Sequence, residues 1–184
     1  MTKTEIRKAV KEKLKTQQDS LSEYSQKICK EILKSQEFTE ADFIFAYSAL
    51  ADEVDLSSVI YEAFKVGKKI ALPKVLAEKS AMIFCEISEN EFTRLKEGYY
   101  GILEPDKASL DINNLDGNIL ILTPGRAFTL DGKRLGRGKG FYDKFFSDIT
   151  KKEIKKMGVC FNFQILAELP VDEFDINMDG LYTN

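Results

Sequence analysis

The segment 123–146, TPGRAFTLDGKRLGRGKGFYDKFF, constrains the fold more strongly than any other stretch of this 184-residue chain. Within it Gly136, Gly138 and Gly140 alternate with Arg137 and Lys139, so the backbone can adopt positive φ and approach a ligand between two cations. The segment contains six basic and two acidic residues, whereas the whole chain carries a net charge of −3. This local inversion of charge predicts an anion-binding loop.

The flanks of the loop predict its structural setting. Residues 118–123, NILILT, have the pattern of a buried strand that ends at Pro124 and Gly125. From Phe141 onward the run FYDKFF predicts a helix whose free backbone N–H groups point into the loop. A strand, a cationic glycine loop and a helix in this order are typical of a phosphate site.

The same residues have an alternative interpretation, a solvated hairpin around Asp131 and Gly132 followed by a flexible basic loop. The segment has neither the GxxxxGK[ST] pattern of a Walker A loop nor the GxGxxG spacing of a dinucleotide fingerprint. Spacing alone leaves both interpretations open.

Composition predicts one globular domain, residues 1–184, because 43% of the residues are hydrophobic and 31% are charged. No apolar run approaches the roughly 20 residues of a membrane span, and the lysine-rich N-terminus has no apolar signal segment. We therefore expect a cytoplasmic protein without a membrane partner. Three cysteines, Cys29, Cys85 and Cys160, lie among apolar neighbours, which favours reduced core residues over disulfides or a zinc site.

The chain contains no histidine. This absence excludes imidazole bases, Ser-His-Asp triads and most transition-metal sites. Lysine, arginine, carboxylates, tyrosine and a hard cation such as magnesium remain. That set suits phosphoryl transfer, in which positioning and charge neutralisation do most of the catalysis.

The first 35 residues predict two amphipathic helices. Thr2 with Glu5 and Ser20 with Glu23 have the spacing of capping boxes ahead of apolar stripes. Lys3 and Arg7 lie one turn apart on a shared face, so they can present two cations to a phosphate chain. Taken alone, their spacing favours solvated surface charge over a binding role.

Residues 42–48, DFIFAYS, predict a central strand, followed by a helix over 56–66 that Asp55 caps and Gly67 closes. The connecting loop places Glu53 beyond the strand's C-terminal end, where open α/β sheets bind ligands. A solvated loop carboxylate is the alternative.

The rest of the chain completes an α/β pattern. Strands are predicted at 69–75, 81–87 and 158–161, with a last edge strand at 181–183. Residues 151–156 are polar enough for an exposed helical extension, and 164–169 for a short helix. Tyr99 and Tyr100, in a glycine-bounded loop, suit either an aromatic wall for a planar ring or edge packing. Together these elements predict a three-layer α/β fold with a mostly parallel sheet.

The motif PGRAFTLDGKRLGRGKGFYD also resembles the signature of the 5-formyltetrahydrofolate cyclo-ligase family, roughly PG-x-AF-x-x-x-G-x-RLG-x-G-x-GYYD. Shorter matches agree with that family in order and spacing along nearly the whole chain. One departure is visible, because Phe174 stands where the family often has histidine. The shorter matches are Lys3 and Arg7 (K-x-x-x-R), DEVD at 52–55, LPK at 72–74, GILEP at 101–105, and LPV at 169–171 followed by Phe174 and Asp175.

The resemblance implies a fold with helices on both faces of the sheet, similar to the phosphosugar isomerase and CoA-transferase architecture. It implies ATP-dependent cyclisation of 5-formyltetrahydrofolate to 5,10-methenyltetrahydrofolate, with ADP and phosphate released. The partners would then be ATP, Mg²⁺ and a reduced folate, with no nucleic acid, and we expect a monomer.

The resemblance also implies site residues. Arg134, Arg137 and Lys139 would be catalytic, and Asp143 and Asp175 would bind magnesium. ATP would contact Lys3, Arg7, Arg134, Leu135, Gly136, Arg137, Gly138, Lys139, Gly140, Phe141 and Tyr142. The folate would contact Ser48, Glu53, Met82, Tyr100, Arg137, Gly138, Lys139, Gly140 and Phe141.

Two rival functions remain at this point. The run RLGRGKGF has the arginine, glycine and aromatic content of RNA-binding segments, although a pI of about 5.3 argues against a nucleic-acid module. The chain can also be a nucleotide sensor that keeps the loop without turnover.

Overall fold

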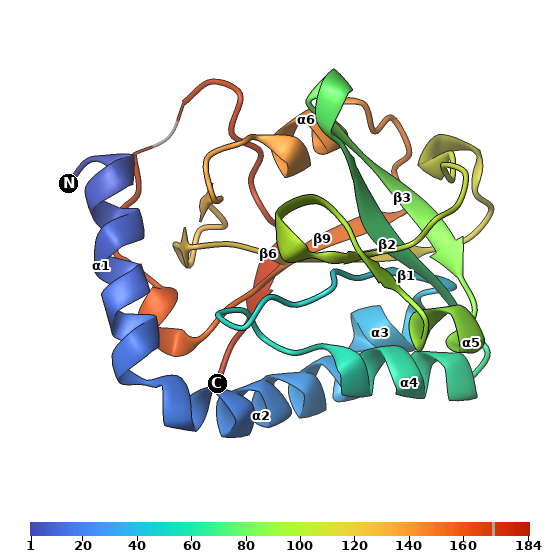
Figure 1. The fold of residues 1–184 in the computed structure, drawn as a ribbon, viewed down its shortest axis with the longest axis horizontal. Helices are drawn as coiled ribbons and strands as arrows, with labels where there is room; N and C mark the ends of the chain where they lie inside the picture. The colour runs from blue at the N-terminus through green and yellow to red at the C-terminus, as the bar shows by residue number, and fades with distance from the viewer. Residues whose placement is uncertain (171) are drawn as a thin grey trace.

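A six-stranded sheet runs through the part of the chain that the computed structural model describes, residues 1–170 and 172–184 (Figure 1). Its strand order is β10-β9-β6-β1-β2-β3, and every neighbouring pair is parallel except β2 with β3. The strands are β1 (Phe43–Phe45), β2 (Lys69–Leu76), β3 (Ala81–Ile87), β6 (Ile119–Pro124), β9 (Ile154–Val159) and β10 (Gly180–Tyr182).

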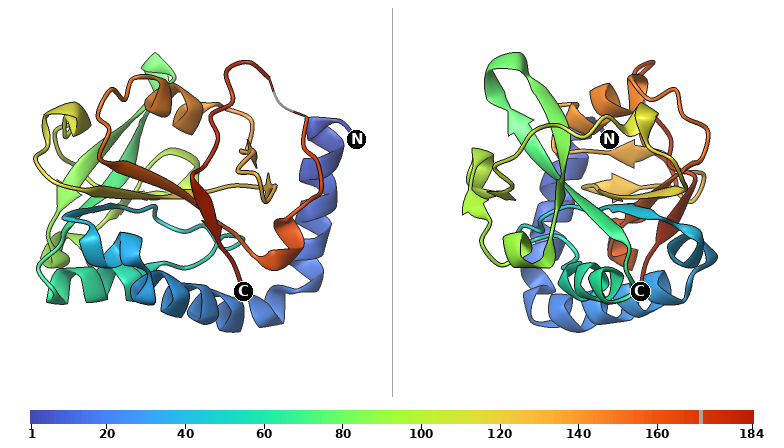
Figure 2. Two further views of the ribbon diagram at one scale, coloured as in Figure 1. Left: turned by 180° about the vertical axis from the view of Figure 1, so that it is seen from behind. Right: turned by 90° about the vertical axis from the view of Figure 1, so that its right-hand side faces the viewer.

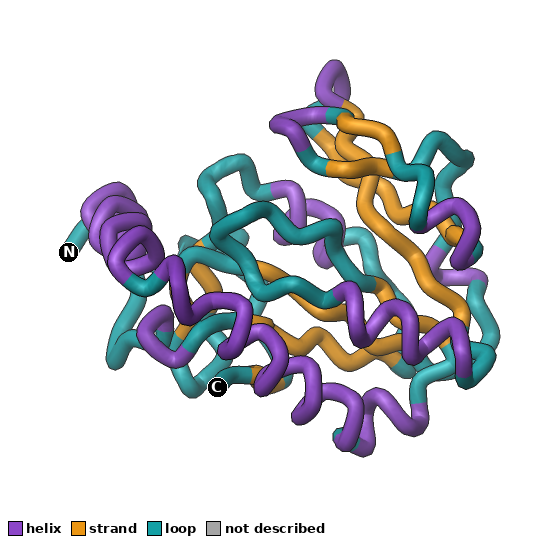
Figure 3. Tube along the Cα trace, turned by 60° about the horizontal axis from the view of Figure 1, so that its bottom comes forward, coloured by secondary structure: helices purple, strands orange, loops and turns teal. Residues whose placement is uncertain are grey.

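Helices cover both faces of this sheet, which confirms the predicted three-layer α/β fold. In Figure 1, α2, α3 and α4 lie below the strands and α6 lies above them, and Figure 3 shows α2 and α4 crossing in front of the strands. Figure 2 shows the same layers from behind and from the side. The helices are α1 (Lys3–Thr16), α2 (Leu21–Lys34), α3 (Gln36–Glu40), α4 (Ser57–Lys65), α5 (Glu89–Phe92) and α6 (Phe141–Ser147).

Two hydrophobic cores lie between these layers because strand side chains alternate between the faces. In β1, Phe43 and Phe45 belong to the core between the sheet and α6, whereas Ile44 belongs to the core between the sheet and helices α2 and α4. All three are at most 4% exposed. Burial on both faces explains why the central strands are almost continuously apolar.

The N-terminal helices form as predicted, with one exception at a cap. Thr2 and Glu5 make both hydrogen bonds of a capping box at the start of α1. The second predicted box is wrong, because the Ser20 side chain makes no capping hydrogen bond. A 3-10 turn, Gln18–Ser20, runs straight into α2, so Ser20 is itself helical and cannot cap.

Residues 151–156 were expected as an exposed helical extension, and this expectation is wrong. The strand β9 begins at Ile154 and pairs in parallel with β6, with Ile119 opposite Ile154. The lysines in this strand hid the signal, because a central ladder position outweighs their weak strand propensity. The predicted helix at 164–169 is also wrong, since only Asn162–Gln164 forms a 3-10 turn. The short helices α3 and α5 had not been predicted.

A hairpin separates β6 from the glycine loop. Strands β7 (Ala127–Phe128) and β8 (Arg134–Leu135) pair across the turn at Asp131 and Gly132. The hairpin of the alternative interpretation is therefore present, but its strands are buried rather than solvated, with Ala127 and Phe128 fully covered. A second small hairpin pairs β4 (Lys96–Glu97) with β5 (Leu103–Glu104).

The strand order places the site. The chain moves from β1 to β2 on one side and returns to β6 on the other, so the order reverses between β1 and β6. The loops after these neighbouring parallel strands leave the same sheet edge, which is where open α/β sheets bind ligands. The expectation that Glu53 and the glycine loop share one edge is confirmed.

Two bulk expectations can be compared with the described residues. Cys29, Cys85 and Cys160 are all free and buried, as expected of core cysteines. Among the described helices, none has the length and apolar character to cross a bilayer.

Candidate active site

A cavity of about 440 Å³ lies at this edge, and we call it the cationic pocket. Its walls are mostly apolar, and cations of the glycine loop, residues 136–140, stand at one side. The lining comprises Tyr47, Ser48, Leu50, Glu53, Pro73, Val75, Met82, Tyr100, Ile102, Glu104, Pro124, Gly125, Arg134, Gly136, Arg137, Lys139, Gly140, Phe141, Tyr142 and Asp143. Twelve of these had been predicted as site residues from the sequence.

Arg134 is the most deeply buried cation of the site. Its side chain is 3% exposed, and Nη2 donates to both carboxylate oxygens of Asp143 at 2.9 and 3.0 Å. Its guanidinium carbon lies 5.4 Å from the centre of the Tyr142 ring. Arg134 is therefore fixed before any ligand arrives, by an ion pair and an aromatic face.

Two residues that line this pocket carry a buried polar atom without a partner in the described part of the chain: Arg134 at Nε and Tyr142 at its hydroxyl. Burial raises the pKa of Tyr142 well above its ordinary value, so its hydroxyl stays protonated at neutral pH. Unpartnered buried polar groups cost free energy, and at a pocket wall they mark where a ligand's polar atoms fit.

The glycine loop presents free backbone donors. Across the described chain, the N–H groups of residues 137–140 donate to no protein acceptor. Gly138 has φ +106° and Gly140 has φ +65°, conformations that favour glycine. Such a run of unpaired N–H groups forms an anion-binding concavity. The helix that follows, α6, has only seven residues, so its dipole adds less than the sequence suggested.

Lys139 is exposed and forms no ion pair with any described carboxylate. Its Nζ lies 6.0 Å from the Tyr100 ring centre, and hydrogen bonding to Tyr100 raises the pKa of Lys139. Tyr100 itself has φ +59°, unusual for a bulky residue, in the turn that closes one side of the pocket. Lys139 thus brings a positive charge that no carboxylate of the described residues neutralises.

Arg137 of the glycine loop is paired with Glu53 of the loop after β1. Nε and Nη2 of Arg137 donate to Oε1 of Glu53 at 3.0 and 2.8 Å, and Oε2 of Glu53 accepts from the Leu50 N–H at 3.0 Å. Nη2 of Arg137 also donates to Asp52. The loop after β1 and the glycine loop after β8 are therefore joined by ion pairs at the pocket.

The N-terminal helix adds its two predicted cations from outside the pocket lining. Nε of Arg7 donates to the carbonyl of Gly136 at 2.9 Å, and Lys3 pairs with Asp175 at 2.6 Å and with Asp172 at 2.7 Å. Burial would raise the pKa of Asp175, but hydrogen bonds from Lys3 and from the Asp172 backbone lower it.

Two other predicted residues do not line the pocket. The side chain of Leu135 is 3% exposed and belongs to the hydrophobic core, so only its backbone is available to a ligand. Gly138 lies beside Arg7 instead, since a Cβ added there would be 3.5 Å from the guanidinium carbon.

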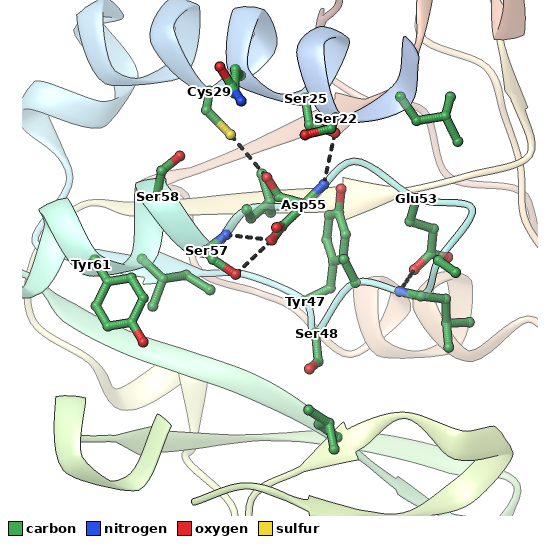
Figure 4. A pocket seen from close by; sticks show the side chains of 18 of the residues that line it. Ser22, Ser25, Cys29, Tyr47, Ser48, Glu53, Asp55, Ser57, Ser58 and Tyr61 are labelled. Carbon is green, nitrogen blue, oxygen red and sulfur yellow. Dashed lines mark hydrogen bonds between the residues drawn. The ribbon is translucent and has the colours of Figure 1, made fainter. Parts of the chain in front are cut away.

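A second and larger hollow, about 840 Å³, is lined by residues of the loop after β1 and of helices α2 and α4 (Figure 4). We call it the serine pocket, because Ser22, Ser25, Ser57 and Ser58 line it. No lysine or arginine is among its described lining residues. Its carboxylate Asp55 already accepts from the N–H and hydroxyl of Ser57, at 2.9 and 2.6 Å. It lacks the charges that a phosphate ligand needs.

Comparisons with known proteins identify the family of the chain. The family model for the 5-formyltetrahydrofolate cyclo-ligase family matches residues 1–184. The chain belongs to this family. The predicted class of enzyme, a ligase, is thereby confirmed, and membership implies ATP and a folate as substrates.

The relatives cover almost the whole chain. A probable 5-formyltetrahydrofolate cyclo-ligase of Caenorhabditis elegans is 29% identical over 188 residues, which is 96% of this chain and 90% of the relative. The NMR structure of the Aquifex aeolicus 5,10-methenyltetrahydrofolate synthetase matches with a TM-score of 0.81 and 32% identity, covering 100% and 90% of the two chains. A 5,10-methenyltetrahydrofolate synthetase of Mycoplasma pneumoniae, at 23% identity, TM-score 0.74 and coverage of 99% and 98%, supports the fold.

Sequence reasoning missed several groups that the fold brings to the site. Asp52 and Arg126 join the ion pairs around Arg137, and Glu104 lines the pocket at 8% exposure. Asp52 directly precedes Glu53, and Arg126 lies inside the glycine-rich motif, so both were in view as charged neighbours. Their pairing depends on the hairpin β7–β8, which the sequence left as an alternative.

Proposed function

We propose that this protein converts 5-formyltetrahydrofolate to 5,10-methenyltetrahydrofolate at the cationic pocket, with ATP cleaved to ADP and phosphate. One observation carries the proposal beyond family membership. Arg134 and Tyr142, whose Nε and hydroxyl are buried without partners, line the same cavity as Gly136, Arg137, Lys139 and Gly140 of the glycine loop, in which the N–H groups of residues 137–140 donate to no described acceptor. These donors converge where a transferring phosphoryl group would need them.

The chemistry explains why such donors are needed. A formyl oxygen is a poor leaving group, so it first attacks the γ-phosphorus of ATP, and the bond from that phosphorus to ADP breaks. The neighbouring folate nitrogen then attacks the formyl carbon, phosphate leaves with the formyl oxygen, and the nitrogen loses its proton. No bond to the protein forms. The protein aligns two ligands and stabilises the charge that moves between them.

Three cations that line the pocket have different roles in this reaction. Lys139 has no acidic partner among the described residues, so its charge is available to the transferring phosphoryl group. Arg134 is held by Asp143 with Nε still free, which aims it without neutralising every donor. Arg137 joins the glycine loop to Glu53 by hydrogen bonds, so it would stand where the folate and the nucleotide meet.

The folate ring fits the apolar part of the pocket. Met82, Tyr100, Ile102 and Phe141 supply walls for a planar ring, and Glu53 supplies a carboxylate for its polar edge. Glu53 is 12% exposed at its side chain, so a hydrogen bond to pterin N–H groups would be shielded from water.

Asp143 and Asp175 would supply only a small part of the coordination shell of a magnesium ion. Each carboxylate is already paired with a cation, Arg134 or Lys3, and no group of three or more metal-ligating side chains occurs in the described chain. Magnesium bound with a nucleotide keeps waters and phosphate oxygens, so one or two carboxylates suffice. When bound, the ion would neutralise phosphate charge.

Replacing Asp143 with Asn tests that assignment. The change keeps the shape but removes the charge, so the magnesium concentration needed for half-maximal turnover should rise. Calorimetric titration of magnesium in the presence of ATP measures the effect directly. An unchanged requirement would leave Asp143 with the single role of holding Arg134.

One assay tests the proposed function. Purified protein is mixed with 5-formyltetrahydrofolate, ATP and magnesium, and the near-ultraviolet absorbance of methenyltetrahydrofolate is followed together with ADP release. We expect one ADP per methenyltetrahydrofolate formed, and no product without ATP. ATP binding without product would favour the nucleotide sensor instead.

A further inference from the structure

Four charged side chains form a continuous chain of ion pairs at the edge of the cationic pocket. Arg126 and Arg137 supply two positive charges, and Asp52 and Glu53 supply two negative charges. Asp52 stands between the arginines, with Oδ2 accepting from Nη1 of Arg126 at 2.6 Å and Oδ1 accepting from Nη2 of Arg137.

The two arginines differ in how firmly their backbones are held. The N–H of Arg126 donates to the carbonyl of Leu135 at 2.7 Å, and its carbonyl accepts from Nε2 of the buried Gln164 at 3.0 Å. Its side chain is 12% exposed. Arg126 is therefore a fixed anchor on the buried hairpin β7–β8.

Arg137, in contrast, lies between Gly136 and Gly138 in a loop whose N–H groups at 137–140 have no protein acceptor in the described chain. Its side chain is 37% exposed. Without side-chain partners its guanidinium would sample many rotamers, because both flanking residues are glycine and the side chain is long. Asp52 and Glu53 are what orient it.

Glu53 cannot do this work alone if it also receives the folate. Its Oε2 already accepts from Leu50, and its Oε1 is the oxygen shared with Arg137. A pterin ring hydrogen-bonded to Glu53 would compete for Oε1, whereas Asp52, which does not line the pocket, would keep its hold on Arg137.

We propose that Asp52 and Arg126 are positioning residues, which fix the guanidinium of Arg137 from the hairpin while Glu53 binds the folate. This proposal rests on the proposed function for its kinetic consequence, but the positioning of Arg137 is a property of the protein alone. Burial would raise the pKa of Asp52, yet hydrogen bonds from Arg137 and Arg126 lower it, so the carboxylate is charged at neutral pH.

The kinetic test compares Asp52→Asn, Arg126→Met and the double variant with wild type. Misplacing Arg137 should lower kcat by about tenfold, while the Kd for each substrate measured alone stays within about twofold. The double variant should be no worse than the more impaired single variant, because both act through one network. Arg126→Lys, which keeps one ion pair, should recover part of the lost kcat.

Lys133→Met is the matched control, since it removes an ion pair of 3.2 Å on the same hairpin that does not touch the loop. It should leave kcat at the wild-type value. Wild-type kcat in Asp52→Asn, losses that add in the double variant, or an equal loss in Lys133→Met would each overturn the proposal.

A second readout does not need turnover. The chain has five arginines, so the ¹⁵Nε resonances of all guanidinium groups can be assigned and their rotation measured. We expect hindered rotation of Arg137 in wild type and fast rotation in Asp52→Asn and Arg126→Met. Unchanged rotation overturns the positioning role even if the enzyme is active. An inactive wild type with the expected rotation would instead contradict the proposed function alone.

Discussion

The cationic pocket and the serine pocket adjoin at the loop after β1, where Tyr47, Ser48, Leu50 and Glu53 line both. The serine pocket is the larger, at about 840 Å³ against about 440 Å³. Size alone favours the serine pocket, but charge favours the cationic one, because the larger hollow has no cation among its described lining residues and Asp55 in its lining is already hydrogen-bonded.

The comparison indicates that polar and charged groups without partners are a better guide to a ligand site than the volume of a pocket. In the cationic pocket a buried guanidinium nitrogen and a buried hydroxyl lack partners, and Lys139 has no acidic neighbour in the described chain. In the serine pocket, Ser25 accepts from the Asp55 N–H and Cys29 donates to the Asp55 carbonyl (Figure 4). Asp55 of the serine pocket is thus already hydrogen-bonded within the protein, whereas two buried polar atoms of residues that line the cationic pocket have no described partner.

The strongest test of this contrast is Arg134→Met. Loss of a preorganised donor should reduce kcat/KM by about 10³-fold. It also leaves Asp143 without its partner, so the free energy of unfolding should fall by about 2 to 3 kcal/mol. Urea denaturation and the absorbance assay measure the two effects.

Lys133→Met is the control for Arg134→Met, because the neighbouring lysine makes only an exposed ion pair with Asp131. Its effect on unfolding should be below about 1 kcal/mol. If both variants lose activity equally, the pocket is not distinguished by its buried cation.

The next largest effect should come from Lys139→Ala. Removal of an unpaired charge beside the transferring phosphoryl group should cost about 2 to 4 kcal/mol of transition-state stabilisation, without loss of folding. Lys144→Ala is the control, since Lys144 lies on α6 and donates to the Ser80 carbonyl instead. If folded Lys139→Ala turns over substrate within a few-fold of wild type, Lys139 is only a solvated loop residue.

A moderate effect is expected for Glu53→Gln. The amide keeps one acceptor but turns a donor toward pterin N–H groups, at a cost of roughly 1 to 3 kcal/mol, so the folate Kd should rise about tenfold. The Kd for ATP measured without folate should stay unchanged.

Asp55→Asn is the paired variant, because Asp55 lies two residues away but lines only the serine pocket. Its carboxylate accepts from the N–H and the hydroxyl of Ser57, the first residue of α4, so stability should fall by about 1 kcal/mol while folate affinity is retained. A weaker folate affinity in Asp55→Asn than in Glu53→Gln would reverse the assignment of the pockets.

The smallest effect should come from filling the serine pocket. Ser22→Tyr adds a bulky side chain at an exposed lining position and should leave kcat/KM within about twofold, as surface substitutions usually do. Ile102→Trp adds comparable bulk to the cationic pocket and should raise the folate KM. Equal losses in both variants would contradict the contrast.

The sequence predicts this site well where the signal is local. The Thr2 cap, the apolar strand β6, the helix at Phe141 and the shared edge of two parallel strands all follow from short-range patterns. The family resemblance supplied Ser48 and Met82, which no local pattern marks, and both line the pocket.

The parts that could not be predicted depend on contacts between distant segments. The ion pair of Asp52 with Arg126 joins residues 74 positions apart, and it requires a buried hairpin that looked solvated in the sequence. The prediction for residues 154–156 of strand β9 failed for the same reason. The lysines of this strand are tolerated because β6 and β10 pair with it on either side. Leu135 looked like part of the loop, although its side chain completes the core.

The most direct test of the account uses methyl groups that line one pocket only. Met82 and Ile102 line the cationic pocket, whereas Ile60 lines the serine pocket. Methyl spectra of labelled methionine and isoleucine are recorded while 5-formyltetrahydrofolate is added without ATP. We expect the Met82 and Ile102 resonances to shift and the Ile60 resonance to stay in place. A shift of Ile60 with Met82 and Ile102 unmoved would contradict the central claim that the smaller, cationic pocket binds the folate.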